Sequence, residues 1–210
     1  FDASVMHAYF RCYSIDWKHL SLTSDRRLVS WHHDIEASQS QSVAKYLHVL
    51  TGGTLNDTGE EIKQYSYSSS WLERRSPTQL VEIELAERSA LQNIFGARGQ
   101  TTMWSCVKRM LSDVTPRGLK RAFVVCNIRA TNDYKDKGHL AYLRNIYNQP
   151  FSSDFRARGI KLDQDRYAVS ELLQWVFRSA IRDGKPVDLY LPSKRMRTLL
   201  HEWSGGVCKV

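Results

Sequence analysis

The fold of this chain is decided by the stretch Tyr167–Arg182, YAVSELLQWVFRSAIR, and by the DGKPVDLYLP that follows it. Apolar side chains recur in the first part at three- and four-residue steps, which is the spacing of a helix with one buried face. These side chains are Val169, Leu172, Leu173, Val176, Phe177, Ala180 and Ile181. Apolar and polar residues then alternate up to Pro192, as in a half-buried strand. We therefore predict a core helix over 167–182 and a strand over 186–191.

A polar stripe is expected on the other side of this helix. Gln174, Arg178 and Arg182 are four residues apart, so they share one face of a continuous helix. Such a stripe is either a solvated surface or a pair of guanidinium groups that reaches a polyphosphate. The second interpretation has a chemical basis, because guanidinium groups bind phosphate oxygens bidentately and stabilise the charge on a transferring phosphoryl group.

The rest of the chain predicts an alternation of helices and strands. Expected helices cover 38–50, 77–97, a segment after 107 and a segment from Leu140 to Pro150, and expected strands cover 101–105 and 121–127. Before residue 77 we also expect a short helix within 1–13, a strand within 15–29, a turn over 51–59 and irregular structure over 62–71. Strands that alternate with helices form parallel sheets. The predicted fold class is therefore α/β, with a parallel sheet flanked by helices.

The segment 121–127, RAFVVCN, is the strongest strand candidate, because its apolar run is typical of a strand buried on both faces. Polar residues follow at once, namely Asn127, Arg129, Thr131, Asn132 and Asp133. Ligands of open α/β sheets bind beyond the carboxyl ends of the strands, so this loop is a candidate ligand site. The alternative is a turn in which Asn and Asp only cap the local backbone.

Three segments resemble conserved motifs of superfamily 2 (DEAD/DEAH-like) helicases. Gln174–Arg182 resembles the last motif, a glutamine followed by two arginines. It departs in two ways: Phe177 stands where the family usually has glycine, and the second arginine comes one residue late. Thr101–Lys108 resembles the motif that opens the nucleic-acid-contacting half, and Asn127–Tyr134 resembles the next one.

The resemblance covers residues 100–203, which are similar to the C-terminal end of helicase-like proteins from phages and mobile elements. It implies a RecA-like parallel sheet that forms the second lobe of a helicase, as a single domain over 1–210. Within that domain, 100–203 is expected to bear the motifs, and 1–95 is expected either to complete the parallel sheet or to form an inserted or irregular part.

The resemblance also implies a role for each matching residue. Arg178 would contact the γ-phosphate of ATP as an arginine finger, with Arg182 as the second candidate. The implied sites are, for catalysis, Arg178, Arg182 and Gln174; for nucleotide binding, Asn132 and Asp133; and for nucleic-acid binding, Thr102, Arg129 and Thr131.

The parts that hold a nucleotide's phosphates are absent from the sequence. It has no G-x-x-x-x-G-K-[ST] phosphate loop and no acidic D-E-x-x motif. The resemblance implies that ATP and Mg²⁺ are bound mainly by an N-terminal RecA-like lobe that precedes Phe1. This chain alone is then not expected to hydrolyse ATP. Its other partner would be nucleic acid, DNA rather than RNA.

Two alternatives stay open. One is a non-catalytic nucleic-acid-binding replication module without ATPase activity, for which basic charge and aromatic residues suffice. The other is a nuclease lobe, which only Asp163 and Asp165 support.

Composition sets broad limits on the partners and setting. The net charge of +8 fits a nucleic-acid or phosphate partner. Cys12, Cys106, Cys126 and Cys208 have no metal-type spacing, and a reduced, cytoplasmic setting in a bacterium or phage-infected cell explains them. The adjacent histidines of Trp31-His32-His33-Asp34 point to different faces, so we expect no metal site. We also expect no membrane span, no signal peptide, and a chain cut from a longer protein.

Overall fold

A four-stranded parallel sheet organises the computed structural model, which describes residues 4–59, 64–128, 132–147 and 152–208. The strands lie side by side in the order β3 (Leu47–Val49), β6 (Val187–Tyr190), β5 (His139–Leu143) and β4 (Thr102–Cys106). All three neighbouring pairs are parallel. The chain therefore starts at one edge with β3, crosses the whole sheet to β4 at the other edge, and returns through β5 to β6, which lies beside β3.

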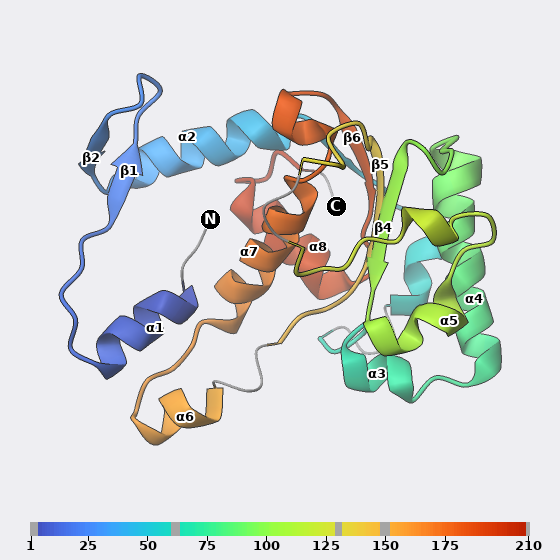
Figure 1. Ribbon diagram of the computed structural model, residues 1–210, viewed down its shortest axis with the longest axis horizontal. Coiled ribbons are helices and arrows are strands. Elements are labelled where there is room, and N and C mark those ends of the chain that lie inside the picture. Colours follow the sequence, from blue (N-terminus) through green and yellow to red (C-terminus); the bar gives the residue numbers. More distant parts are fainter. Residues whose placement is uncertain (1–3, 60–63, 129–131, 148–151, 209–210) are drawn as a thin grey trace.

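Helices cover both faces of the sheet (Figure 1). One face carries α2 (His33–Ala44), α7 (Gln164–Val176) and α8 (Lys194–Trp203), and the other carries α3 (Ser69–Glu73), α4 (Pro77–Arg88) and α5 (Leu111–Val114). Each face has its own buried apolar cluster, centred on Leu172 and Leu189 in the first case and on Trp104 and Leu91 in the second. The α/β class, with a parallel sheet between helices, is confirmed.

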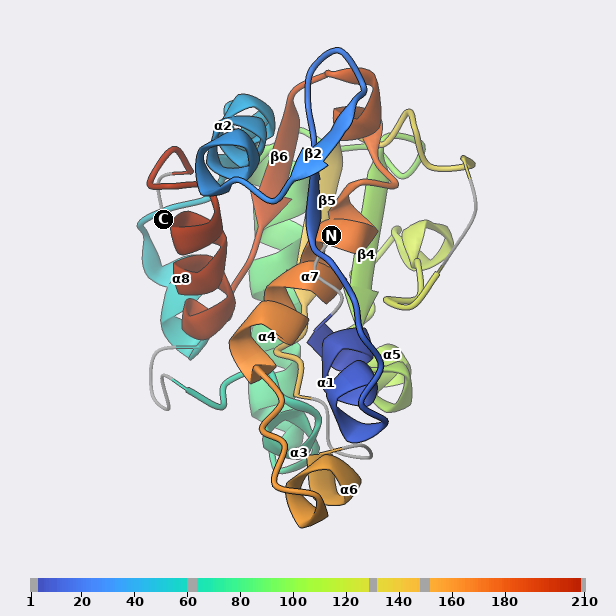
Figure 2. The same cartoon turned by 90° about the vertical axis from the view of Figure 1, so that its left-hand side faces the viewer.

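An N-terminal arm lies apart from the sheet (Figures 1 and 2). It consists of α1 (Ser4–Cys12) and an antiparallel hairpin of β1 (Leu20–Leu22) and β2 (Leu28–Ser30). Its helix packs against α6 (Ser152–Ala157). Shorter elements complete the chain: 3₁₀ turns at Thr54–Gly59, Lys108–Met110, Lys120–Ala122 and Ala180–Asp183, and a π-helical turn at Ser89–Ile94 that extends α4. Among the described residues, no helix is long and apolar enough to cross a bilayer.

Helix α7 is shorter than predicted, and this changes the arginine stripe. Its start is fixed by Asp163, whose carboxylate accepts hydrogen bonds from the backbone of Asp165 (3.1 Å) and Arg166 (3.0 Å). Its last residue is Val176, and a separate 3₁₀ turn begins after Ser179. The expectation of one continuous helix over 167–182 is therefore wrong. Residues 174, 178 and 182 do not share a helical face.

Two strand assignments also differ from the prediction. Within 121–127 only Phe123 pairs with the sheet, by a parallel bridge to Trp104 at its outer edge. The segment after Leu140 was expected to be helical but forms β5. Its residues Leu140–Leu143 are fully buried, and a strand buried on both faces has no two-residue alternation to distinguish it from a helix. Strand β3 likewise falls within the predicted helix 38–50.

Candidate functional site

A row of polar side chains crosses the sheet near the amino ends of its strands. The register pairs His48 with Asp188, Asp188 with His139, and His139 with Thr102. The Asp188 carboxylate lies 3.4 Å from Nδ1 of His48 and 3.0 Å from Nδ1 of His139. When both imidazoles donate from Nδ1, Nε2 of each ring remains an acceptor. The row thus joins three adjacent strands through one carboxylate.

Sequence reasoning missed this row because its members are far apart in the chain. His48, His139 and Asp188 belong to no local motif. Only the strand register brings them together, and that register depended on two strands, β3 and β5, that were predicted as helix.

Three of the predicted site residues gather at the same amino edge. Arg182 donates a hydrogen bond from Nη1 to Oδ1 of Asn132. Thr102 is the first residue of β4, and its hydroxyl donates to the carbonyl of Arg98 at 2.7 Å. The backbone links their segments, since Ala180 N lies 3.0 Å from the carbonyl of Lys137 and Gly138 N lies 3.0 Å from that of Thr101. The helicase-like segments thus converge in space.

The edge at which they converge is not the predicted one. Asn132 was expected beyond the carboxyl end of a strand over 121–127. That segment pairs with the sheet at one residue only, Phe123, and it leaves the edge of the sheet after Cys126. The Cys126 thiol still lies 2.7 Å from the Ser105 hydroxyl. The chain then passes Ile128 and Tyr134, packed against the α7 side of the sheet, to reach the start of β5. The predicted carboxyl-edge position of this loop is wrong for Asn132.

The other predicted residues are more dispersed. Gln174 is half-buried on α7, and its amide donates to the Ser170 hydroxyl at 3.4 Å. Arg178 follows the end of α7, and its buried Nε has no hydrogen-bond partner among the described residues. Asp133 is exposed. Arg129 and Thr131 lie outside the described residues.

The carboxyl ends of β5 and β6 are closed by an internal arginine. The Arg195 guanidinium contacts the Asp165 carboxylate at 2.6 Å and Oδ1 of Asn145 at 2.7 Å. It also donates to the carbonyls of Gln164 and Ile146, each at 3.1 Å. Only 9% of the Arg195 side chain is exposed. This arginine holds α7 and α8 to the sheet.

The carboxyl end of β3, in contrast, is followed by an open glycine turn. Gly52 and Gly53 both have positive φ (74° and 73°), and a Cβ built on either would meet nothing within 4 Å. This position, after the first strand of a parallel sheet, is where nucleotide-binding α/β folds place a phosphate loop. Here the turn reads Thr51-Gly52-Gly53-Thr54 and contains no lysine. It therefore lacks the cation that neutralises a polyphosphate.

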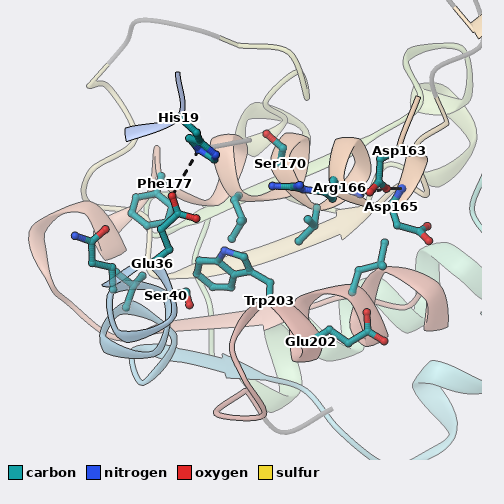
Figure 3. Close-up of a pocket in the computed structure, with 15 residues that line it drawn as sticks. His19, Glu36, Ser40, Asp163, Asp165, Arg166, Ser170, Phe177, Glu202 and Trp203 are labelled. Carbon is teal, nitrogen blue, oxygen red and sulfur yellow. Dashed lines mark hydrogen bonds and ion pairs between the residues drawn. The ribbon is translucent and has the colours of Figure 1, made fainter. Parts of the chain in front are cut away.

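A groove of about 720 Å³ lies between α2, α7 and α8 (Figure 3). Its walls are apolar, formed by Val43, Val169, Leu173, Phe177, Leu199 and Trp203. Carboxylates stand at its border, among them Glu36, which pairs with His19 at 3.6 Å, and Glu202. The lining carries four carboxylates, those of Glu36, Asp163, Asp165 and Glu202, against one guanidinium, that of Arg166, so its charge balance is unfavourable for a polyphosphate. The lining of the groove includes Asp163 and Asp165, the two carboxylates of the nuclease alternative, and none of the residues implied by the helicase resemblance.

Two buried titratable groups lie on the α4 side. Glu87 is fully buried, and neither of its carboxyl oxygens has a hydrogen-bond partner among the described residues. Burial, with a smaller contribution from Glu84, raises its pKa well above the usual range. Burial likewise raises the pKa of the Cys106 thiol, with Glu87 adding to the effect. In the part of the chain that the structure describes, no cluster of three or more His, Cys, Asp or Glu side chains could hold a metal ion.

Comparisons with known proteins agree with the fold. Residues 41–204 match the model of the YonV C-terminal Rossmann-like domain. The chain is 31% identical over 207 residues to the SPbeta prophage-derived uncharacterized protein YonV of Bacillus subtilis (strain 168). The match covers 97% of this chain and 50% of that protein, so the chain spans about half the length of this relative. No solved structure matches the chain. This chain belongs to the family of YonV C-terminal Rossmann-like domains.

Proposed function

We propose that this chain is the second, RecA-like lobe of an ATP-dependent nucleic-acid helicase or translocase. In this role it supplies an arginine to ATP and Mg²⁺ that are bound mainly by another lobe. The observation that carries the proposal is the convergence of the three helicase-like segments at the amino edge of one parallel sheet, where Arg182 meets Asn132.

The glycine turn after β3 supports a lobe that completes a site rather than one that holds the nucleotide. It occupies the place of a phosphate loop but lacks the lysine that binds the β- and γ-phosphates. An arginine finger, in contrast, is commonly delivered across an interface and does not need the carboxyl edge of its own sheet. The exposed amino edge is suited to that role.

The structure favours Arg182 over Arg178 as the finger. Arg182 is exposed, and its guanidinium already contacts Asn132, which would orient it. Arg178 is half-buried, with a shielded Nε, so an approaching phosphate would reach it less easily. This reverses the order that the sequence motif alone implies.

The test compares two arginine variants in the natural gene product that contains this chain. Arg182→Ala should lower strand-stimulated ATP turnover by about 10³-fold or more, the effect typical of an arginine finger, and leave strand binding unchanged. Arg178→Ala should have the smaller effect. Lys185→Ala removes an exposed cation from the same edge and serves as the matched control.

Two results would count against the proposal. Equal losses from Arg182→Ala and Lys185→Ala would indicate a general effect of charge rather than a finger. Unchanged turnover in Arg182→Ala would remove this arginine from the nucleotide site.

A further inference from the structure

Exposed aromatic and apolar side chains are concentrated on the N-terminal arm, which runs from α1 through the hairpin to Trp31. More than half of the large hydrophobic side chains that are exposed in the described residues belong to it, and it includes two of the tryptophans. Trp17 has 38% and Trp31 45% of its surface exposed. The arm lies before residues 41–204, which match the Rossmann-like domain. The exposed side chains of the arm therefore lie outside the part of the chain that matches the Rossmann-like domain.

The rings of the arm form a continuous series of contacts. His7 stacks on Trp17 with centroids 4.1 Å apart and an interplanar angle of 10°. Trp17 contacts His19 at 6.2 Å, and His19 stacks on Trp31 at 5.8 Å with an angle of 17°. Trp31 in turn contacts His33 at 6.3 Å. Each indole is thus held by an imidazole while a large part of it stays in contact with solvent.

Exposed basic side chains lie on the same arm and on the neighbouring segment around α6. The exposed cations of the arm are Arg11, Lys18, Arg26 and Arg27; Arg156 on α6, and Arg158 and Lys161 just after it, are exposed as well. The Arg158 guanidinium lies 5.3 Å above the Tyr13 ring. The carboxylates on the arm are Asp16 and Asp25, and Asp25 pairs with Arg27. Beyond the arm, Glu36 faces His19. On the arm itself four cations face two carboxylates, so the arm carries a net positive charge, while Asp34 and Glu36 lie just beyond it.

We propose that the arm is a binding surface for single-stranded nucleic acid, with Trp17 and Trp31 as stacking platforms for bases and the surrounding arginines and lysines as phosphate contacts. Exposed aromatic rings within a positively charged track are the arrangement that binds single strands without sequence preference. Rings held in place before binding lose little conformational entropy when a base stacks on them. This surface is distinct from the amino edge of the sheet and acts without ATP.

The test measures binding of a fluorescein-labelled oligothymidylate to the natural gene product, without ATP or Mg²⁺. Trp17→Ala and Trp31→Ala should each weaken binding by about 5- to 150-fold, the range for loss of one base–aromatic stack. Trp31→Tyr should restore most of the affinity, because it retains a ring. Binding should also quench tryptophan fluorescence and weaken with salt.

Leu28→Ala is the matched control. Leu28 is the most exposed large hydrophobic residue of the hairpin, at 68%, and it is apolar but cannot stack on a base. Strand binding should be unchanged in this variant. Equal weakening by Trp31→Ala and Leu28→Ala would overturn the proposal. So would unchanged strand binding in both tryptophan variants combined with a loss of thermal stability in the whole gene product. That second result would assign the arm to protein docking instead.

Failure of this inference and failure of the helicase-lobe proposal give different results. A tryptophan variant that binds strands poorly should need more oligonucleotide to stimulate ATP turnover but reach the same maximum rate. An Arg182→Ala variant should bind strands normally and fail at turnover. Tryptophan variants that bind normally would refute the arm surface alone.

Discussion

Glu87 provides a quantitative test of the packing between α4 and the sheet. Its side chain is fully buried beside Cys106 and Tyr190, and neither carboxyl oxygen has a partner among the described residues. Because burial raises its pKa, the folded protein keeps the proton at pH values where the unfolded chain has already lost it, above about pH 4.3. The free energy of unfolding should therefore fall as pH rises through this window.

The magnitude follows from proton linkage. One proton bound only by the folded state changes the free energy of unfolding by about 1.4 kcal/mol per pH unit. Glu87→Gln removes this dependence, so between pH 5 and pH 6 the variant should gain about 1.4 kcal/mol relative to the wild type. Glu87→Leu also removes two unpaired polar atoms and should be more stable than Glu87→Gln by about 1–3 kcal/mol at either pH.

Urea unfolding of the three proteins at pH 5 and pH 6 measures these differences, with Glu82→Gln as control. Glu82 is an exposed carboxylate on the same helix, so its replacement should leave the pH dependence unchanged. A wild type and a Glu87→Gln variant that change in parallel between the two pH values would refute the reasoning. That result would mean that Glu87 is ionised in the folded protein.

Two further predictions concern buried side chains. Arg195→Met should lower the free energy of unfolding by about 1–3 kcal/mol in urea titrations, because it leaves Oδ1 of the buried Asn145 without the donor that Arg195 supplies. Arg109→Met is the control, because it removes only an exposed ion pair with Glu73 and should cost less than about 1 kcal/mol. Equal losses of stability in the two variants would contradict the role of Arg195 in holding α7 and α8 to the sheet. In thiol labelling at pH 8, half-exposed Cys12 should react first, whereas Cys106 and Cys208, whose pKa values are raised by burial, should react only on unfolding. Early labelling of Cys106 would show that the α4 side opens in the folded state.

Much of the architecture was predictable because its signals are local. The alternation after Gly184 predicts β6, and Thr101–Ser105 predicts β4 to within one residue. Helix α4 begins at the expected Pro77, where Ser76 and Gln79 form a capping box. These elements have turn residues or caps at their ends, so the bounds of each element can be located from the local sequence.

What could not be predicted depends on contacts between distant segments. β5 is buried on both faces, and its apolar run has the same spacing as a helix face. The break after Val176 arises because Ser179 and Gly184 stabilise a new turn, which the apolar periodicity does not indicate. The burial of Arg195 requires Asp165 and Asn145 to meet, and the His48–Asp188–His139 row requires the register of three strands.

The helicase-lobe proposal is tested most directly by nucleic-acid-stimulated ATP hydrolysis of the natural gene product beside this 210-residue chain. The proposal predicts strand-dependent turnover in the gene product, loss of that turnover in its Arg182→Ala variant, and no turnover in the isolated chain. Absence of turnover in the natural gene product with any strand, while the isolated chain still binds strands in a salt-sensitive way, would contradict it. That result would assign the chain to non-catalytic nucleic-acid binding.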